Sequence, residues 1–303
     1  MKKEKINGII SVIKGKATFN APMRNYTTFG IGGYADVLVD VVDINDLKSV
    51  IVFANDHNLN TYILGEGSNV LVKDNGIRGI VVRLKGEFLK TEIKGNKATT
   101  GSGVLLNQLV RQCSEKGLTG IEFLAGIPGT VGGAVIMNAG AWGSQIFDYI
   151  ESVTVFDMKS NEKVFLTREK IKYEYRKTDI TKRKLVVLFA EFKLKVDKID
   201  ECTNRIDQFI KKRKQNHPFH LPNAGCIFKN PGKSHAGKII EEIGFKNKQI
   251  GNVQVSGKHA NFIVNMGSGK ASDVIALIEK IEKASMKEKG VKLEREIVII
   301  GED

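Results

Sequence analysis

Four glycine clusters in the first half of the chain constrain its fold more than any other feature. They are Gly30-Ile31-Gly32-Gly33, Gly65-Glu66-Gly67-Ser68-Asn69, Gly101-Ser102-Gly103 and the segment 126–133. Glycine allows positive φ and close approach of the backbone to a ligand, so that consecutive N–H groups can point at a phosphate. Any one cluster alone is more often a tight turn between strands. Together, the four clusters suggest loops that let the backbone approach a ligand, and a pyrophosphate suits them.

Strand-like runs and amphipathic segments alternate along the 303 residues. Helical spacing of apolar residues, with Asp43 as an N-cap, predicts a helix over 43–58, and further helices are predicted over 104–116, 198–214, 238–243 and 272–289. Strands are predicted over 36–40, 61–64, 80–84, 185–196 and 296–300, near residues 226, 254 and 262, and as hairpins within 88–100 and 151–167. Because no steady βαβ repeat is visible, the pattern predicts an α+β fold.

The length of the chain suggests two domains, since a typical domain has roughly 150 residues. The charged amphipathic segment 198–217, which ends at His217-Pro218, is expected to connect them. We therefore expect a first region over 1–197, with subdomains at about 1–86 and 87–197, and a second domain over 198–303.

The formal net charge of +13 favours anionic partners, which include phosphorylated small molecules, nucleic acid and acidic membranes. Nucleic acid fits poorly, because 34 acidic residues accompany the basic ones and aromatic residues make up only 7%. The uncharged run 123–147 is long enough to cross a bilayer, but its glycines, Pro128 and Asn138 indicate a buried glycine-rich loop. We therefore expect no nucleic acid partner and no stable membrane insertion.

The cysteines and histidines give no sign of a disulfide or metal framework. Cys113, Cys202 and Cys226 lie far apart, which argues against both a disulfide scaffold and a thiolate zinc site. The five histidines are dispersed, so no metal site is expected. Residues 1–16 lack the apolar core of a signal peptide. These features together predict a protein of the reducing cytoplasm.

Residues 30–35 fit the pattern G-x-G-x-x-A of dinucleotide-binding proteins. That fingerprint requires a helix directly after the glycines, whereas Asp36-Val37-Leu38-Val39-Asp40 is typical of a strand. We therefore interpret the match as accidental.

Five segments resemble, in the same order, the motifs of one enzyme family. They are GEGSNVL at 65–71, GIPGTVGGA at 126–134, YEYR at 173–176, GCIFKNP at 225–231 and LEREI at 293–297. In these segments the chain resembles the MurB family of UDP-N-acetylenolpyruvoylglucosamine reductases, from about residue 26 to its end. One such string would be weak evidence, but five in order are specific.

The resemblance implies a flavoenzyme of bacterial peptidoglycan synthesis. Such an enzyme binds FAD, takes a hydride from NADPH and reduces UDP-N-acetylenolpyruvoylglucosamine to UDP-N-acetylmuramate. It implies a vanillyl-alcohol-oxidase-type FAD-binding fold of two α+β subdomains in 1–197 and a C-terminal α+β substrate domain in 198–303. The compact segment 226–296 resembles the shorter subclass, which lacks an inserted tyrosine loop. Another flavin oxidoreductase of this fold would share the glycine loops without needing Arg176, Cys226 and Glu296.

The resemblance also gives three residues a chemical role. Hydride addition to the enolpyruvyl methylene carbon spreads negative charge onto the carboxylate, which Arg176 is expected to bind through paired hydrogen bonds. Glu296 is expected beside the same carboxylate, either protonated or orienting a donor. Cys226 stands where the family usually has serine, and a thiol, with a reference pKa of about 8.5, keeps a proton donor there. Without the resemblance, Cys226 is typical of a small buried apolar residue and Arg176 of a solvated arginine.

The binding residues follow from the same resemblance. The cradle of the FAD pyrophosphate is expected to comprise Gly65, Gly67, Ser68, Asn69, Gly129, Thr130, Gly132 and Gly133. Tyr175, Lys229 and Asn230 offer donors to the diphosphate or sugar of the substrate, although Lys229 is almost as typical of an exposed lysine. Arg213, beside Lys211, Lys212 and Lys214, is expected to attract the UDP group or NADPH. A basic run at a helix end equally suits the negative pole of the helix dipole.

Overall fold

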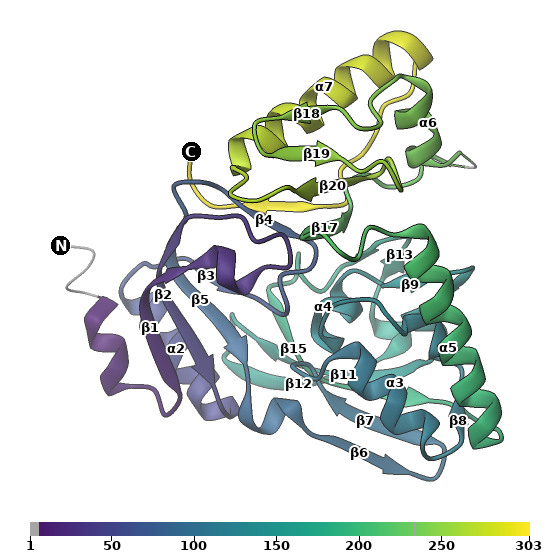
Figure 1. Ribbon diagram of the computed structural model, residues 1–303. Coiled ribbons are helices and arrows are strands. Elements are labelled where there is room, and N and C mark those ends of the chain that lie inside the picture. Colours follow the sequence, from purple (N-terminus) through teal and green to yellow (C-terminus); the bar gives the residue numbers. More distant parts are fainter. Residues whose placement is uncertain (1–5, 233) are drawn as a thin grey trace. The chain divides into compact units, whose positions relative to one another are not determined.

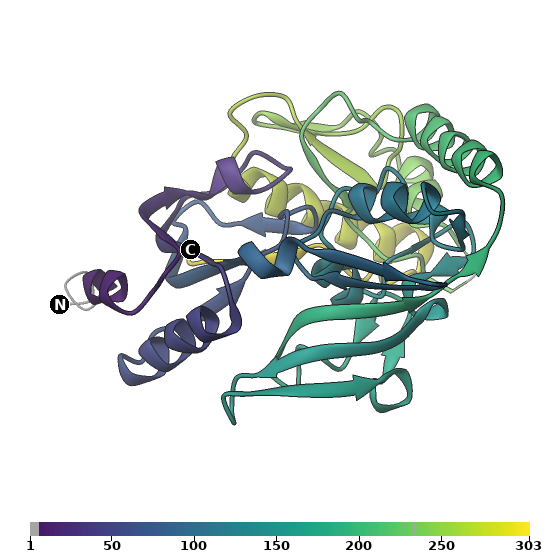
Figure 2. The ribbon, with the colours of Figure 1, turned by 90° about the horizontal axis from the view of Figure 1, so that it is seen from below.

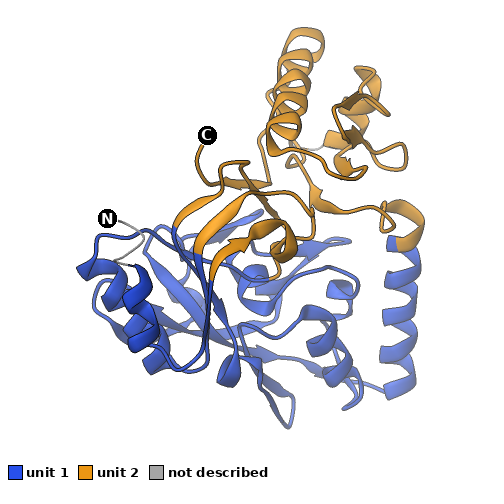
Figure 3. Ribbon diagram, turned by 60° about the vertical axis from the view of Figure 1, so that its left-hand side comes forward, with its two compact units in different colours: residues 1–18, 37–65, 79–213 blue, residues 19–36, 66–78, 214–303 orange. Residues whose placement is uncertain are grey.

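The chain forms two units, and neither is continuous in sequence. The computed structural model describes residues 6–232 and 234–303. Unit 1 comprises residues 1–18, 37–65 and 79–213, and unit 2 comprises 19–36, 66–78 and 214–303 (Figure 3). The boundary expected at 197/198 therefore differs from the one observed at 213/214, and two earlier segments join the C-terminal unit. The contacts of unit 2 explain this, because Phe29, Ile31 and Leu71 belong to its apolar core.

A four-stranded sheet opens the fold, in the order β1-β2-β5-β3. The strands are β1 (Lys16–Pro22), β2 (Tyr34–Val41), β5 (Ile77–Leu84) and β3 (Thr61–Ile63), with β3 and β5 parallel. The expected helix is α2 (Ile44–Asp56), and the side chain of Asp43 accepts a hydrogen bond from the Asp46 N–H, as an N-cap does. The segment 30–35 leads into β2 and not into a helix, which confirms that it is no dinucleotide fingerprint.

The main sheet of unit 1 has five antiparallel strands in the order β12-β11-β15-β7-β6 (Figure 2). Both expected hairpins are present, and the strands are β6 (Thr91–Lys94), β7 (Lys97–Gly101), β11 (Ile150–Asp157), β12 (Glu162–Thr167) and β15 (Leu185–Lys193). Two helices, α3 (Leu106–Ser114) and α4 (Val131–Ile136), lie over this sheet (Figure 1). Their buried side chains form one apolar cluster with those of the strands.

The uncharged run 123–147 is more ordered than a loop. It contains the end of a 3₁₀ turn (Glu122–Leu124), helix α4, the short strands β9 (Gly140–Ala141) and β10 (Ser144–Gln145), and the start of a second 3₁₀ turn (Ile146–Asp148). Helix α4 was not predicted, because its glycines carry no apolar side chains that would show the helical spacing. The expectation of a purely irregular segment was thus wrong, although many of its residues are buried as expected. Within residues 6–232 and 234–303, no helix is long and apolar enough to cross a membrane.

Unit 1 ends with a short hairpin and a long helix. Strands β13 (Tyr173–Glu174) and β14 (Lys177–Thr178) form the hairpin, and β16 (Lys195–Val196) pairs with β8 (Leu118–Thr119). Helix α5 (Ile199–Asn216) follows, close to the expected bounds. A charge network fixes it to the rest of unit 1, because Arg205 donates to both Glu122 and Asp197.

Unit 2 builds a smaller α+β layer. Its antiparallel sheet has the order β17-β20-β19-β18, from β17 (Asn223–Cys226), β18 (Gln249–Ile250), β19 (Val253–Val255) and β20 (Phe262–Asn265). Helices α6 (Ala236–Glu242) and α7 (Ala271–Lys289) pack with it in one apolar cluster (Figure 1). The last strand, β21 (Val298–Ile300), pairs in parallel with β4 (Val70–Val72). This pairing draws residues 66–78 into the C-terminal unit.

Replacing Arg205 by alanine tests how the charge network holds α5. Burial alone would raise the pKa of Glu122, but hydrogen bonds from Thr119, Gly120 and Arg205 outweigh it and leave this pKa below its ordinary value. Loss of a buried ion-pair partner costs about 3 to 5 kcal/mol, and we expect about 2 to 3 here because the Arg205 side chain is 33% exposed. Urea unfolding at pH 7 measures this loss.

The same variant makes a prediction about pH. A lowered native pKa stabilises the fold above the ordinary carboxyl value of about 4.3, and this contribution disappears as the pH falls through the native pKa. The difference in unfolding free energy between wild type and Arg205→Ala should therefore stay nearly constant from pH 7 to about pH 5, and it should shrink as the pH falls further, through about 4.3 towards the native pKa of Glu122. Lys211→Ala, at an exposed position of the same helix, should change little at either pH. A difference that stays constant with pH would contradict this account.

Candidate functional site

In unit 1, Thr130 brings two of the glycine clusters together. A Cβ atom on Gly65 would lie 2.5 Å from the Thr130 hydroxyl oxygen, so only glycine fits at this position. The same hydroxyl accepts a hydrogen bond of 3.3 Å from the Gly133 N–H and thereby caps the first turn of α4. The carbonyl of Gly129 accepts from the Leu106 N–H at 3.0 Å. The predicted residues Gly65, Gly129, Thr130 and Gly133 therefore lie in one region of unit 1.

A third cluster, 101–103, lies against the same helix. A Cβ atom on Gly132 would come within 2.8 Å of the Ser102 Cβ, and the Gly132 N–H donates to the Ser102 carbonyl at 2.8 Å. The Ser102 side chain is buried, and among the described residues its hydroxyl finds no hydrogen-bond partner. Gly133 is exposed, and a Cβ atom there would meet only the Thr130 hydroxyl, at 3.6 Å. The Ser102 hydroxyl lacks a partner among the described residues, and Gly133 on the same helix is accessible. Both features suit a cofactor that carries phosphate oxygens.

In unit 2, the remaining residues of the second cluster lie next to the predicted catalytic segments. Gly67 has a φ of +65°, and a Cβ atom there would lie 2.5 Å from the Tyr26 carbonyl oxygen. The carbonyl oxygen of Ser68 is 3.9 Å from the Cβ position of Gly225, the residue before Cys226. The side-chain amide of Asn69 donates to the Glu296 carbonyl at 3.0 Å. Residues 67–69 thus border both Cys226 and Glu296.

Backbone pairing places Cys226 and Glu296 on adjacent segments of unit 2. The Ile227 carbonyl accepts from the Glu296 N–H at 2.8 Å, and Phe228 forms an isolated antiparallel bridge with Arg295. The buried Asn261 side chain accepts from the Phe228 N–H and donates to the Phe228 carbonyl, as a neighbouring strand would. Residues 226–228 are therefore held on both sides.

The thiols differ in what they can do. Cys226 is partly exposed, whereas Cys113 and Cys202 are buried. Burial raises the pKa of Cys113 to about 12, and it also raises the pKa of Cys202. Of the three cysteines, all of which the structure describes, Cys226 is the one with access to a ligand.

The predicted substrate-binding residues of unit 2 already have partners within the protein. The Lys229 ammonium group forms an ion pair with Glu294, whose side chain is 73% exposed. The side-chain oxygen of Asn230 accepts from the Ala236 N–H at 3.0 Å and satisfies the start of α6. Both residues follow Cys226 closely, so a ligand near the thiol could reach them.

Tyr175 and Arg176 form the turn of the β13–β14 hairpin in unit 1. Arg176 has a φ of +56°, a conformation in which a non-glycine residue is uncommon and strained. Its guanidinium donates to the Gly140 carbonyl at 2.7 Å and lies 5.0 Å from the centre of the Tyr175 ring. Tyr175 is half exposed. The turn thus holds the guanidinium in place, and its predicted role at a substrate carboxylate stays a prediction.

Arg213 is buried, with only 6% of its surface exposed, although the sequence pattern suggested a residue of a basic helix end. Its guanidinium donates to the carbonyls of Ala125 and Phe123 at 2.7 and 2.9 Å, and it lies 5.8 Å from the Trp142 ring. It therefore joins α5 to the segment just before the second of the five motif segments, 126–134. Its predicted contact with an anionic ligand stays a prediction.

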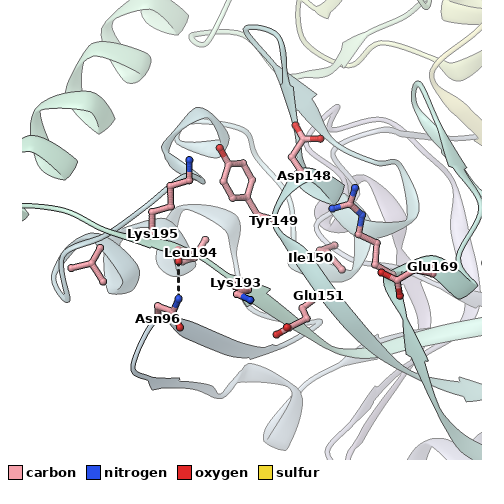
Figure 4. A pocket seen from close by; sticks show the side chains of 11 residues that line it. Asn96, Asp148, Tyr149, Ile150, Glu151, Glu169, Lys193, Leu194 and Lys195 are labelled. Carbon is pink, nitrogen blue, oxygen red and sulfur yellow. Dashed lines mark hydrogen bonds between the residues drawn. The ribbon is translucent and has the colours of Figure 1, made fainter.

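A pocket of about 650 Å³ opens elsewhere in unit 1 (Figure 4). Its lining comes from Asn96, residues 148–151, residues 168–169 and residues 193–196, and the Asn96 amide donates to the Leu194 carbonyl across it. Its lining includes both carboxylates and cationic side chains, and none of the predicted site residues lines it. We assign it no role in the chemistry.

Comparison with known proteins gives this site its class. Residues 35–164 match the model of an FAD binding domain, and this range contains all the glycine residues that cluster around Thr130. Residues 217–300 match the model of the C-terminal domain of UDP-N-acetylenolpyruvoylglucosamine reductase. The chain is thus an FAD-binding oxidoreductase with the expected α+β fold.

Relatives over nearly the whole chain define the family. The reductase of Clostridium novyi is 41% identical over 94% of this chain and 92% of its own length, and that of Bacillus pumilus is 39% identical over 98% of both. The crystal structure of the reductase from Thermus caldophilus covers 95% of this chain and 100% of its own, with a TM-score of 0.82 and 34% identity. The chain belongs to the UDP-N-acetylenolpyruvoylglucosamine reductase (MurB) family of peptidoglycan synthesis.

Sequence reasoning missed two buried polar residues near these motifs. Ser102 was noted only as part of a glycine cluster, and Asn138 only as a polar residue in the uncharged run. Asn138 has a φ of +42° and 1% exposure. Its position a few residues after Gly133, the last glycine of the motif, was a usable signal, since asparagine tolerates the left-handed conformation that ends a helix.

Gly133→Ala separates cofactor binding from folding. Because a Cβ atom has room at this helical position, the apoprotein should keep its stability or gain up to about 1 kcal/mol from the better helix former. If FAD approaches the start of α4 closely, the added methyl group should lower FAD occupancy of the purified protein. Flavin absorbance per chain and urea unfolding of apoprotein measure the two effects. Unchanged FAD occupancy would place the cofactor away from Gly133.

Proposed function

We propose that this chain is an NADPH-dependent reductase that converts UDP-N-acetylenolpyruvoylglucosamine to UDP-N-acetylmuramate. The single observation that carries the proposal is the similarity of nearly the whole chain to reductases of this family. We assign the chemistry to Arg176, Cys226 and Glu296, which lie in the motif segments of the sequence. FAD, when bound and reduced by NADPH, supplies the hydride that adds to the methylene carbon of the enolpyruvyl group. The remaining tasks belong to the chain itself: to hold the cofactor, to stabilise charge and to deliver a proton.

Cofactor binding is assigned to the glycine segments. Gly65, Gly129, Thr130, Gly132 and Gly133 gather in unit 1. The N–H groups of Gly132 and Gly133 already donate to Ser102 and Thr130, so we assign the pyrophosphate oxygens to the Thr130 hydroxyl proton and to the N–H groups of Gly65 and Gly129. Gly67, Ser68 and Asn69 are assigned to the same cofactor. Of these, Asn69 also supports Glu296, because its side-chain amide donates to the Glu296 carbonyl. One asparagine thereby serves both the cofactor loop and the acidic residue.

Arg176 is assigned to the carboxylate of the enolpyruvyl group. When the methylene carbon takes the hydride, negative charge develops on the neighbouring carbon and on this carboxylate. A guanidinium stays charged throughout and donates two parallel hydrogen bonds to a planar carboxylate. Its strained turn and its hydrogen bond to Gly140 hold it in one orientation, so little reorganisation is needed as the charge develops.

Cys226 and Glu296 are assigned to the proton and the acid beside the carboxylate. The thiol gives its proton to the carbon next to the carboxylate, which completes the reduction of the double bond. Glu296, half-buried, either carries a proton or orients a donor. The backbone pairing of Ile227 with Glu296 and the bracketing by Asn261 keep these two side chains on adjacent segments.

Substrate binding is assigned to Tyr175, Lys229, Asn230 and Arg213. Tyr175 offers a half-exposed ring and hydroxyl, and Lys229 offers a charge that exchanges its exposed partner Glu294 for a diphosphate. Arg213 is assigned an indirect part, since its guanidinium already bonds to two carbonyls. The substrate domain is assigned to residues 198–303, within which the family's C-terminal model matches 217–300.

Two half-reactions in the absence of oxygen test the function. The purified protein should show an oxidised flavin spectrum, lose it on addition of NADPH and recover it when UDP-N-acetylenolpyruvoylglucosamine is added. Another sugar or alcohol in place of this substrate is the control and should leave the flavin reduced. If only the control compound restores the oxidised spectrum, the chain is a different flavin oxidoreductase of the same fold.

Substitution of Cys226 tests the proton donor. A positioned donor contributes about 10² to 10⁴-fold, so Cys226→Ala should slow flavin reoxidation by the substrate by this factor and leave reduction by NADPH unchanged. Cys226→Ser keeps a protic group and should retain most activity. Cys202→Ala, at a buried thiol, serves as a matched control. Wild-type reoxidation in Cys226→Ala would show that the proton comes from elsewhere.

A further inference from the structure

We infer that Asn138 is a positioning residue that fixes the turn carrying Arg176. This inference rests on the proposed role of Arg176 at the substrate carboxylate. Asn138 itself touches neither cofactor nor substrate in this account. It acts through the hairpin that contains Arg176, and all the contacts that carry the argument lie within unit 1.

Asn138 stands directly after α4 in a demanding conformation. Its φ is +42°, and only 1% of the residue's surface is exposed. Its N–H donates to the Val135 carbonyl at 3.1 Å. The left-handed conformation turns the chain sharply at the end of the helix. The side-chain amide consequently points into the protein, where it must find hydrogen-bond partners.

The amide nitrogen of Asn138 joins two hairpins. It donates to the Gln145 side-chain oxygen at 2.7 Å and to the Glu174 carbonyl at 2.9 Å. Gln145 lies on β10, where it pairs with Gly140, and its own backbone is fixed by Asp148. Glu174 is the last residue of β13 before the Tyr175-Arg176 turn. One NH₂ group therefore links the β9–β10 hairpin to the β13–β14 hairpin.

These contacts form a closed circuit around Arg176. Asn138 bonds to Gln145, Gln145 pairs with Gly140, and the Gly140 carbonyl accepts from the Arg176 guanidinium at 2.7 Å. The chain then runs back from Arg176 to Glu174, whose carbonyl accepts from Asn138. A strained φ of +56° at Arg176 persists only where the surroundings hold it, and this circuit supplies that restraint.

A second hydrogen bond ties the other strand of the hairpin to the same helix end. The hydroxyl of Thr178, a buried residue on β14, donates to the Ile136 carbonyl at 2.9 Å. Both strands of the hairpin are thus anchored at the C-terminal end of α4. The N-terminal end of α4 carries Thr130 and Gly133, which belong to the predicted cofactor cradle. A six-residue helix therefore sets the distance between that cradle and Arg176.

Both hydrogen bonds that the Asn138 side chain makes with the described residues are donated by its nitrogen. The side-chain oxygen is buried and has no hydrogen-bond partner among the described residues. A buried acceptor without a partner destabilises the fold, and a small apolar residue would avoid this cost. An asparagine at this position is consistent with a requirement for the two bonds that its nitrogen donates.

The test compares Asn138→Ala with the matched control Asn161→Ala. Asn161 also lies in unit 1, has a φ of +56°, and has a buried side-chain oxygen without a partner among the described residues, but it belongs to the turn between β11 and β12. The holoenzyme is used throughout. Three readouts are taken: the rate of flavin reduction by NADPH, the rate of reoxidation by the substrate, and amide hydrogen exchange of residues 172–180.

Asn138→Ala should leave the NADPH half-reaction unchanged and slow reoxidation by about 10²-fold, the usual consequence of misplacing a reacting group by about 1 Å. Exchange in 172–180 should become faster. In an Arg176→Ala background the substitution should have little further effect on reoxidation, because the residue it positions is gone. Asn161→Ala should match wild type in all three readouts.

The proposal is wrong if the double variant slows reoxidation by the product of the two single-variant factors, because the two residues would then act independently. It is also wrong if Asn138→Ala slows both half-reactions equally, or if amide exchange in 172–180 is unchanged. If Asn138→Ala does not fold, Thr178→Val, which removes the second bond between the hairpin and the end of α4, carries the same expectations. If Arg176→Ala itself reoxidises at the wild-type rate, the proposed role of Arg176 fails. The exchange measurement then still decides separately whether Asn138 holds the hairpin.

Discussion

The structure of unit 1 depends on the two ends of one short helix. At its start, the Thr130 hydroxyl caps Gly133 and leaves space at Gly65 for hydrogen alone. At its end, the Ile136 carbonyl and Asn138 accept and donate the bonds that hold the hairpin of Arg176. A helix of this length is marginal by itself, so its order comes from these end contacts and from its burial against the five-stranded sheet. The predicted cofactor loop at 129–133 and the hairpin of Arg176 are thereby attached to the two ends of one helix.

In unit 2, backbone pairing holds the predicted site residues in place. Residues from three distant parts of the chain meet there, because β4 pairs with β21 and the segment after β17 bonds to Glu296. Among the described residues, side-chain amides satisfy backbone groups that no neighbouring strand pairs with. Asn69 donates to the Glu296 carbonyl, and Asn261 bonds to both the N–H and the carbonyl of Phe228. Polar side chains with fixed partners give a partly exposed thiol and carboxyl a defined backbone.

Long elements with clear periods were predictable, and the functional turns were not. Helices α2, α5 and α7 and both hairpins of the five-stranded sheet appear close to their expected bounds, since their apolar spacing is itself the driving force for burial. Helix α4 has glycines at positions where apolar side chains would reveal a helical period. The turn at Arg176 is two residues long, which is too short for any periodic pattern. The motifs identified the predicted site residues, but the burial of Arg213 and the partners of Lys229 depend on contacts between distant segments.

By itself, the sequence determined the α+β class and the family, and it predicted the residue types of the site: glycines, an arginine, a thiol and an acid. These follow from local spacing and from residue identity, which need no knowledge of distant contacts. Only the tertiary structure decided that residues 19–36 and 66–78 belong with the C-terminal unit, and that Asn138 bridges two hairpins. Strand pairing and buried hydrogen bonds join residues far apart in the chain, and no local pattern specifies which partner each will find.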